Sequence, residues 1–201
     1  QGIYKWSGTG SNGTIAHGLG GTPKVMMVKQ LNSTAGWQVY HWMLGATKVI
    51  YLNSTATPDT SSTVWNDTEP NATTFALGTN TGTNDSGSDY IGYVFCDVPG
   101  YFTSGLYFGN YDTNGPMIYT GFRPSLVMVK CSNDTGNWLM FDNKRLGYNA
   151  DNRYLEANDT DAEATSYTIN IYSNGFKCTE TSAGSDLNGN SDSYCWMAWG
   201  H

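Results

Sequence analysis

The sequence predicts an all-β protein, a duplicated antiparallel β-sandwich of the lectin-like or jelly-roll type. Gly, Asn, Ser and Thr supply 84 of the 201 residues. All four are poor helix formers, and Gly, Asn and Ser favour turns. Between these polar stretches lie short segments rich in aromatic and β-branched residues, such as 90–95 and 106–108, as is typical of strands. No long segment keeps an apolar stripe at helical spacing, so a helical bundle is not expected.

The chain contains two copies of one pattern. Five blocks of the first copy recur in the same order in the second, 101 to 104 residues later. The matched blocks are 23–29 with 124–130, 37–40 with 138–141, 51–53 with 154–156, 75–77 with 176–178, and 90–93 with 194–197. Five ordered matches, with insertions confined to polar stretches, indicate an internal duplication.

Each copy is expected to fold as a series of short strands. The order is an apolar strand, a Trp-led strand, a Tyr-Leu strand, a Phe strand and a Tyr-rich closing strand, and an opening strand at 3–6 has its counterpart at 106–108. The short turn-like link around Pro99 predicts repeat one over 1–98 and repeat two over 99–201. Two sheets packed face to face are expected, with one sandwich fused from both copies as the open alternative.

Composition and charge exclude several classes of protein. The formal net charge is −7 and the 10 Lys and Arg are scattered, whereas a nucleic-acid binder shows a basic patch. No apolar run is long enough for a membrane span. Aromatic residues make up 14% of the chain, which argues against disorder. A weakly charged, aromatic-rich surface suits neutral partners such as glycans, and equally a soluble structural protein.

No motif for catalysis or for a cofactor is present. His17, His41 and His201 lie at no metal-ligand spacing with another His or Cys, and no nucleophile signature occurs. We therefore expect no enzyme and no cofactor, although a glycosidase carboxylate pair is a matter of spatial separation that sequence does not give.

A weak calcium candidate occurs late in the second copy. Oxygen-bearing side chains alternate at Asp186, Asn188, Asn190 and Asp192, and calcium prefers oxygen ligands. The glycine at 189 is misplaced for a helix-loop-helix calcium loop. An Asn/Gly turn between strands is the favoured interpretation.

Four aromatic residues are the candidates for ligand binding. Repeat-matched Trp37 and Trp138 are expected to be core anchors, because a scaffold is shared between copies while binding loops diverge. The unmatched aromatics in polar, loop-like contexts are Trp42, Trp65, Tyr111 and Tyr148. Sugars stack their C–H faces on such rings, so these four are predicted to bind a glycan.

Two further features have structural interpretations. Asp142 and Arg145 are close enough to pair across a tight turn, as an ion pair of small energetic value if exposed. The four cysteines, Cys96, Cys131, Cys178 and Cys195, are expected to be buried, as reduced thiols rather than a disulfide.

Segments of both copies resemble phage tail-fibre sequences. In the first copy the resemblance lies in 16–20 leading into 23–29. In the second it lies in 109–110, 120–124, 127–130, 138–142 with Arg145, 173–176 and 188–194, which are similar to an uncharacterised family of tail-associated proteins in phages of marine bacteria and cyanobacteria. The first copy departs from this pattern, because His41 and Leu44 stand where Asp142 and Arg145 stand in the second.

The resemblance implies a virion-surface or tail-fibre module with a lectin-like β-sandwich, and it carries over no catalytic residue. We expect a non-enzymatic phage structural protein on the virion surface, extracellular after release, that attaches to host-surface glycans or another receptor. Its other partners would be virion proteins and further copies of itself, as a homotrimer. The alternatives are a purely structural decoration or filament subunit without a ligand and, third, a glycan-degrading enzyme.

Overall fold

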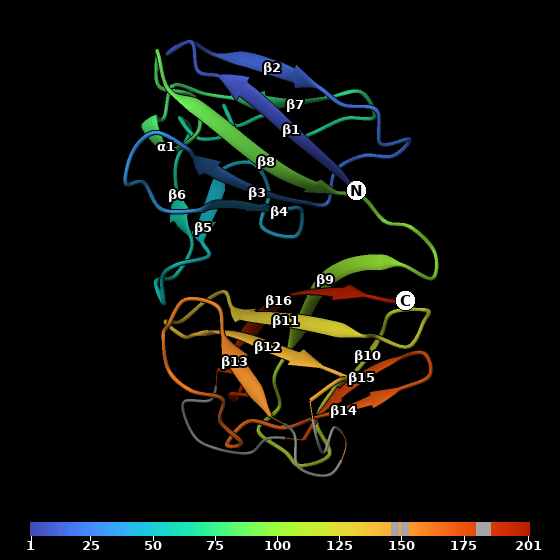
Figure 1. Cartoon of the computed structure of the whole chain (residues 1–201). Helices are drawn as coiled ribbons and strands as arrows, with labels where there is room; N and C mark the ends of the chain where they lie inside the picture. The colour runs from blue at the N-terminus through green and yellow to red at the C-terminus, as the bar shows by residue number, and fades with distance from the viewer. Residues whose placement is uncertain (146–148, 150–152, 180–185) are drawn as a thin grey trace. The chain divides into compact units, whose positions relative to one another are not determined.

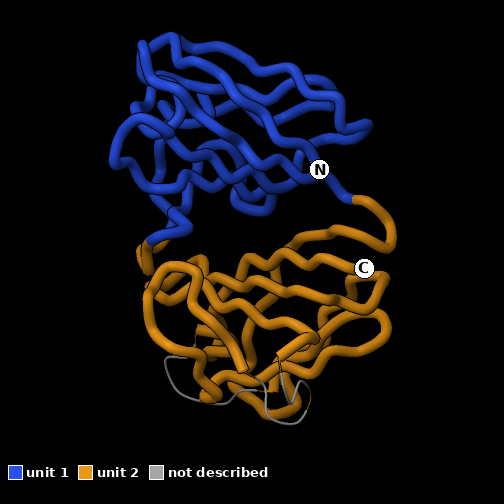
Figure 2. Tube along the Cα trace, viewed as in Figure 1, with its two compact units in different colours: residues 1–53, 58–97 blue, residues 54–57, 98–201 orange. Residues whose placement is uncertain are grey.

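The chain forms two compact units (Figure 2). The computed structural model describes residues 1–145, 149, 153–179 and 186–201. Unit 1 comprises Gln1–Asn53 and Pro58–Asp97, and unit 2 comprises Ser54–Thr57 and Val98–His201. Ser54–Thr57 thus belongs to unit 2 although it interrupts the sequence of unit 1, a feature that nothing in the sequence signals.

Unit 1 consists of a large and a small antiparallel sheet (Figure 1). The strands of the large sheet are β1 (Gly2–Ser7), β3 (Val25–Gln30), β4 (Gln38–His41), β5 (Lys48–Tyr51), β6 (Asp59–Thr60) and β8 (Asp89–Phe95). Their order across the sheet is β1-β8-β3-β4-β5-β6. The small sheet pairs β2 (Gly13–Ala16) with β7 (Thr74–Leu77). A single-turn helix, α1 (Thr81–Asn84), begins after Asn80, whose side chain accepts a hydrogen bond from the Gly82 backbone at 2.8 Å.

Unit 2 is built in the same way. The strands of its large sheet are β9 (Phe102–Phe108), β11 (Leu126–Cys131), β12 (Trp138–Asp142), β13 (Tyr154–Glu156) and β16 (Ser193–Trp199). Those of its small sheet are β10 (Met117–Tyr119), β14 (Ile169–Tyr172) and β15 (Gly175–Cys178). The large sheet runs β13-β12-β11-β16-β9 and the small sheet β10-β15-β14, all antiparallel.

The duplication is visible in the strand order and in the register. The run β1-β8-β3-β4-β5 of unit 1 corresponds strand for strand to β9-β16-β11-β12-β13 of unit 2. Gln30 lies opposite Tyr90 in unit 1, and Cys131 lies opposite Tyr194 in unit 2. The two units are therefore copies of one sheet with one register.

One of the matched blocks is misplaced. Tyr51 pairs with Gln38, whereas Glu156 pairs with Leu139, the residue equivalent to Gln38. Tyr51 thus corresponds to Glu156, and the match of 51–53 with 154–156 is wrong by two residues. The Tyr-Leu pair occurs in both copies but at different places in the two sheets: Tyr154 is part of the core of unit 2, while Tyr51 lies at the margin of the core of unit 1.

Each unit has its own hydrophobic core between its two sheets. The core of unit 1 includes Trp6, Met26, Val28, Tyr40, Val49, Trp65, Phe75, Leu77, Tyr90 and Val94. The core of unit 2 includes Tyr107, Ile118, Val127, Val129, Leu139, Phe141, Tyr154, Ile171, Phe176 and Tyr194. These residues alternate along their strands with side chains on the other face, as the two-residue period of a strand requires.

An aromatic pair occupies the same place in both cores. The Trp6 ring stacks on Tyr90 with centroids 5.8 Å apart, and the Tyr107 ring stacks on Tyr194 at 4.9 Å. Such contacts add to the stabilisation from burial. The predicted fold class, an all-β protein of antiparallel sandwich type, is confirmed. In the part of the chain that the structure describes, no helix has the length and apolar character needed to cross a membrane.

Candidate functional site

The structure separates the four aromatic residues predicted to bind a ligand. Trp42 and Tyr111 are exposed, with 37% and 44% of their surfaces accessible. Trp65 lies in a turn region, as expected, but it is only 1% exposed, so the prediction that its ring binds a ligand is wrong. Tyr148 lies outside the described residues.

Trp65 is a core residue because the chain turns directly after it. Its ring packs edge-on against Tyr40, with centroids 6.0 Å apart. Asn66 and Asp67, which follow it, adopt positive φ angles of 53° and 45°, a conformation that Asn and Asp tolerate better than most residues. The polar neighbours therefore form the turn, while the indole lies beneath it in the core of unit 1.

Trp42 and Tyr111 both lie in turns. The Lys24 ammonium lies 3.9 Å from the centre of the Trp42 ring, a cation–π contact that holds the indole in place. Tyr111 has a positive φ of 54°, and its backbone N–H donates to the Asn188 carbonyl at 3.1 Å. Each unit thus has one of these exposed rings, and the Trp42 ring is held by Lys24.

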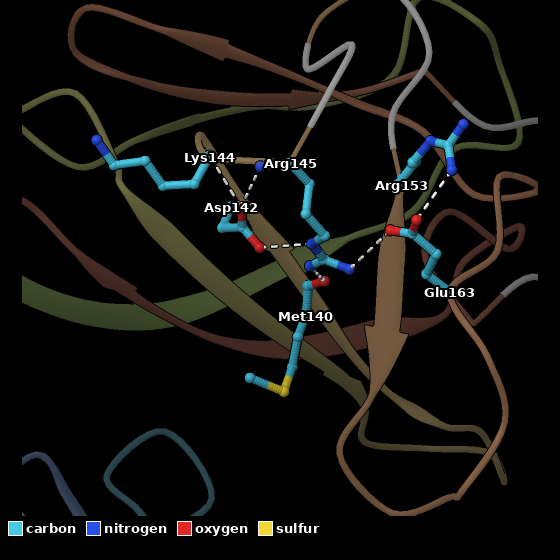
Figure 3. A network of polar contacts seen from close by, with 6 residues as sticks. All are labelled: Met140, Asp142, Lys144, Arg145, Arg153 and Glu163. Carbon is cyan, nitrogen blue, oxygen red and sulfur yellow. Dashed lines mark hydrogen bonds and ion pairs between the residues drawn. The ribbon is translucent and has the colours of Figure 1, made fainter.

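Asp142 and Arg145 form the predicted pair across a turn (Figure 3). Asp142 Oδ1 accepts the backbone N–H groups of Lys144 and Arg145, both at 2.9 Å, and Oδ2 lies 2.6 Å from Arg145 Nε. Arg145 Nη2 donates to the Met140 carbonyl at 2.8 Å. Burial alone would raise the pKa of Asp142, but the two backbone N–H groups and the guanidinium outweigh it and lower the pKa.

The network continues through Glu163. The Arg145 guanidinium lies between Asp142 and Glu163, with Nη1 4.0 Å from Glu163 Oε2. Arg153 Nη1 approaches the other carboxylate oxygen, Oε1, at 2.9 Å. In unit 1 the residue equivalent to Asp142 is His41. Its Nδ1 accepts a hydrogen bond from the backbone N–H of Met43 at 3.4 Å. A side chain at this position therefore binds backbone N–H groups of the turn in both units, a carboxylate in unit 2 and an imidazole in unit 1. The Asp142–Arg145 ion pair thus has a structural role in stabilising the turn.

Lys130 is a buried lysine that bonds to two backbone carbonyl groups. Its Nζ donates to the Cys131 carbonyl at 2.8 Å and to the Thr55 carbonyl at 3.3 Å. Burial lowers the pKa of Lys130. The equivalent Lys29 of unit 1 makes the same bond to the Gln30 carbonyl, at 2.7 Å. The repeated contact indicates that the lysine closes the end of its strand.

Two carboxyl groups of unit 2 have raised pKa values. Burial raises the pKa of Asp186, whose carboxylate accepts the Asn137 backbone N–H at 3.0 Å. Burial raises the pKa of Glu156 most, and the negative charge of Asp186 raises it further. The charge of Asp186 thus acts on Glu156, and Glu156 is the carboxyl group to substitute in a test for glycan cleavage.

Side chains of the predicted calcium site form hydrogen bonds within the protein. Asn188 is fully buried; its Oδ1 accepts the Asn110 N–H and its Nδ2 donates to the Asp112 carbonyl, both at 3.0 Å. Asp192 Oδ1 accepts from the Asn133 amide at 3.4 Å. Among the described residues, no group of three or more His, Cys, Asp or Glu side chains is placed to hold a metal ion.

Two exposed tyrosines that sequence reasoning missed flank a glycine on the small sheet of unit 2. Tyr119, at the end of β10, is 71% exposed, and Tyr172, at the end of β14, is 42% exposed. Gly175, the first residue of β15, is the register partner of both. The three residues form one row across the sheet, which we call the tyrosine row.

Both rings of the tyrosine row lie on the face away from the core. Ile118 and Ile171, which precede the tyrosines, are buried in the core of unit 2, and successive side chains of a strand point to opposite faces. Since neighbouring strands lie about 4.8 Å apart, the two tyrosine backbones are about 9.6 Å apart. Gly175 places no side chain between them. Within the described residues, neither phenol hydroxyl has a hydrogen-bond partner.

Unit 1 has no equivalent of the tyrosine row. Ile15, which pairs with Phe75, corresponds to Ile118, so Ala16 stands where unit 2 has Tyr119. The small sheet of unit 1, which is described throughout, contains only β2 and β7 and lacks a counterpart of β14. The row thus meets the criterion that binding features diverge while the scaffold is shared.

A signal for the tyrosine row was present in the sequence. Apolar and polar residues alternate along 169–172, and a two-residue link, Ser173 and Asn174, leads to Gly175. This is the pattern of a hairpin with one half-buried face, and it assigns Tyr172 to the outward side. That Tyr119 lies in the same row depends on the pairing of β10 with β15, which no local pattern specifies.

A family model for a domain of unknown function (DUF7483) matches residues 2–201. The chain therefore belongs to this family over nearly its whole length. No curated protein and no solved structure is detectably similar to the chain.

Proposed function

We propose that the chain is a non-enzymatic module of a phage tail fibre, or of another exposed part of a virion, that attaches the particle to host-surface glycans. The tyrosine row is the observation that carries the proposal. It presents two exposed aromatic rings on a rigid, hydrogen-bonded sheet, away from the core of unit 2. The placement in a virion rests on the sequence resemblance alone.

The chemistry of the row suits a saccharide. A sugar ring offers C–H groups that stack on an aromatic face and hydroxyl groups that need hydrogen-bond partners. The two phenol hydroxyls are available for such bonds. The next row on the same face adds the Asn170 amide and the Lys177 ammonium, which are register partners on β14 and β15. Apolar rings with a few convergent polar groups are the usual composition of a ligand site.

Affinity for a cell surface would come from multivalency. A single row offers few contacts and binds weakly, but several copies on one particle combine through effective concentration. A homotrimer, as the resemblance implies, would present three rows to one surface. Trp42 with Lys24 in unit 1 is a second exposed ring held in place and would add contacts of the same kind.

The second candidate function is purely structural. Large exposed aromatic side chains are also typical of subunit interfaces, and Tyr119 with 71% exposure fits that role as well. In that case the tyrosines would contact neighbouring copies or other virion proteins. The two functions differ in whether a saccharide competes for the same residues.

The test is a glycan array and a host-cell binding assay on the folded, assembled chain. We expect saturable binding without release of reducing sugar. The double variant Tyr119→Ala/Tyr172→Ala should lower binding at least tenfold while thermal unfolding stays near that of the parent. Phe108→Ala is the matched control, because Phe108 is an equally exposed aromatic residue of unit 2, at 66%, outside the row.

Other outcomes would overturn the proposal. Undiminished binding by the double variant would remove the row from the site, and the variant Trp42→Ala/Tyr111→Ala then tests the remaining exposed aromatics. Absence of any binding, together with dissociation of the assembly in the double variant, would support the structural function. Release of reducing sugar that is abolished by Glu156→Gln would show an enzyme.

A further inference from the structure

We infer that the saccharide bound at the tyrosine row carries an anionic group, a carboxylate or a sulfate, and that Lys177 is the residue that selects it. This inference rests on the proposed function and names the class of ligand for the same face. It is drawn from the second row of the outward face, which consists of Met117, Lys177 and Asn170.

Lys177 lies on the same face as the tyrosines. It is two residues beyond Gly175 on β15, and Phe176 between them is fully buried in the core. Residues two apart on a strand share a face and lie about 6.6–6.8 Å from each other. An extended lysine side chain is long enough to span that distance, so its ammonium meets a substituent of a saccharide at the tyrosine row when the side chain turns from Asn114 toward Gly175.

The ammonium group is positioned and only partly used. Lys177 Nζ donates to Asn114 Oδ1 at 2.5 Å. Asn114 precedes Met117, the register partner of Lys177, so this bond holds the ammonium on the side of Lys177 away from Gly175. A lysine has three N–H donors, so two are left for a ligand. Asn170, its register partner, makes no side-chain hydrogen bond within the described residues and supplies an amide for neighbouring hydroxyls.

The charge on this face has the opposite sign to that of the whole chain. The net charge of the protein is −7, yet the outward positions of β10, β14 and β15 carry one lysine and no carboxylate. A neutral sugar would need no cation there. A carboxylate or sulfate forms a charge-assisted hydrogen bond with an ammonium, which is stronger than a bond between neutral groups.

The two tyrosines are close enough to contact one saccharide. Their backbones lie about 9.6 Å apart, and a sugar ring stacks on an aromatic face at about 3.5–4.0 Å. Its exocyclic acidic group would then point along β15 toward Lys177. A sugar acid is thus held by stacking at one row and by charge at the next.

The experiment compares saccharides that differ only in charge, on the full chain. The probes are a polyuronate oligosaccharide with its carboxyl-reduced neutral form, and a sulfated galactan oligosaccharide with its desulfated form. At low salt we expect at least one anionic probe to bind about tenfold more tightly than its neutral form. The pair that shows the preference identifies the carboxylate or the sulfate, and added salt should reduce the ratio.

The variants assign the preference to one residue. Lys177→Met should bring the anionic and neutral forms to equal affinity without weakening the neutral form, and Lys177→Arg should keep the preference. Lys144→Met is the matched control, because Lys144 is an exposed lysine of unit 2 outside the small sheet, and only its backbone N–H contacts Asp142. Tyr119→Ala/Tyr172→Ala should weaken both forms.

Failure of the inference is distinct from failure of the proposed function. Equal affinity of the parent for charged and neutral forms, or a preference that survives Lys177→Met, would overturn the role of Lys177 while glycan binding stands. If the folded parent binds no saccharide of any kind, the proposed function falls and this inference with it.

Discussion

Asn84 and Asn188 hold equivalent loops in the two units. Both are buried, with 3% and 0% of their surfaces exposed. Asn84 Oδ1 accepts the backbone N–H of Thr9 at 2.9 Å, and Asn188 Oδ1 accepts that of Asn110 at 3.0 Å. Because unit 1 uses the same residue for the same purpose, Asn188 acts as a clamp of its loop, with its amide bonded to Asn110 and Asp112.

Alanine at either asparagine should destabilise the protein. Asn84 Nδ2 donates to the buried Gly78 carbonyl at 2.7 Å, and loss of the amide leaves this buried group unpaired, at a cost of about 1–3 kcal/mol. We expect this decrease in the free energy of unfolding for Asn84→Ala and for Asn188→Ala, measured by urea denaturation. Asn12→Ala, at an exposed site, should change it by less than about 0.5 kcal/mol. Equal effects of all three variants would contradict the clamp.

The acid stability of the chain should depend on Asp142. Its pKa is lowered in the folded state, so the carboxylate stabilises the fold above its unfolded pKa of about 3.9. That contribution is lost as the pH falls through the lower, folded pKa. Asp142→Asn should therefore lower the Tm at neutral pH, and the difference from the parent should shrink toward pH ~2.

Asp161→Asn serves as the control for this pH series, since Asp161 is exposed. Its Tm should follow that of the parent across the whole range. A difference between Asp142→Asn and the parent that is constant with pH would show that the side chain acts through shape and not through its charge.

Much of the fold was readable from the sequence, for a physical reason. The strands are short segments rich in aromatic and β-branched residues between polar turns, and duplication marks them a second time. The mismatch of Tyr51 with Tyr154 shows the limit of this reading. A two-residue match can arise by chance, whereas the register of a strand is set by its pairing with the neighbouring strand.

The candidate site was harder to predict from the sequence, because the exposure of a side chain depends on how the strands pair and pack. Trp65 has polar neighbours and is nonetheless buried, since its turn folds it against Tyr40. Tyr119 and Tyr172 lie 53 residues apart in sequence and become a pair only through Gly175 between them. Local composition therefore identified aromatic loops but not the row that two strand pairings create.

Trp65 should matter for stability and not for binding. Trp65→Ala removes a fully buried indole from the core of unit 1 and should cost about 3–5 kcal/mol of unfolding free energy. Trp42→Ala removes an exposed indole and its contact with Lys24, and should cost no more than about 1 kcal/mol. Chemical denaturation measures both.

Trp65→Phe separates the two roles. Trp65 Nε1 is buried and has no acceptor within the described residues, so phenylalanine loses no hydrogen bond and keeps an aromatic core. We expect Trp65→Phe to fold and to bind glycans as the parent does. Weakened binding by this folded variant would return Trp65 to the binding site.

The thiols of Cys178 and Cys195 should be inert in the native protein. Burial raises the pKa of each to about 12, and the thiolate is the reactive form. At pH ~8 only about one thiol in ten thousand would be ionised at such a pKa. All four cysteines are free and buried, so an alkylating reagent should label them at rates set by opening of the fold.

Peptide mapping by mass spectrometry after timed alkylation provides the measurement. In denaturant without reductant, all four cysteines should be labelled completely, as free thiols require. Under native conditions, Asn188→Ala should accelerate labelling of Cys178 in the core of unit 2, because it loosens the loop of that unit, whereas Asn84→Ala should leave that rate unchanged if the units open separately. Equal acceleration by both variants would mean that the two units open as one cooperative structure.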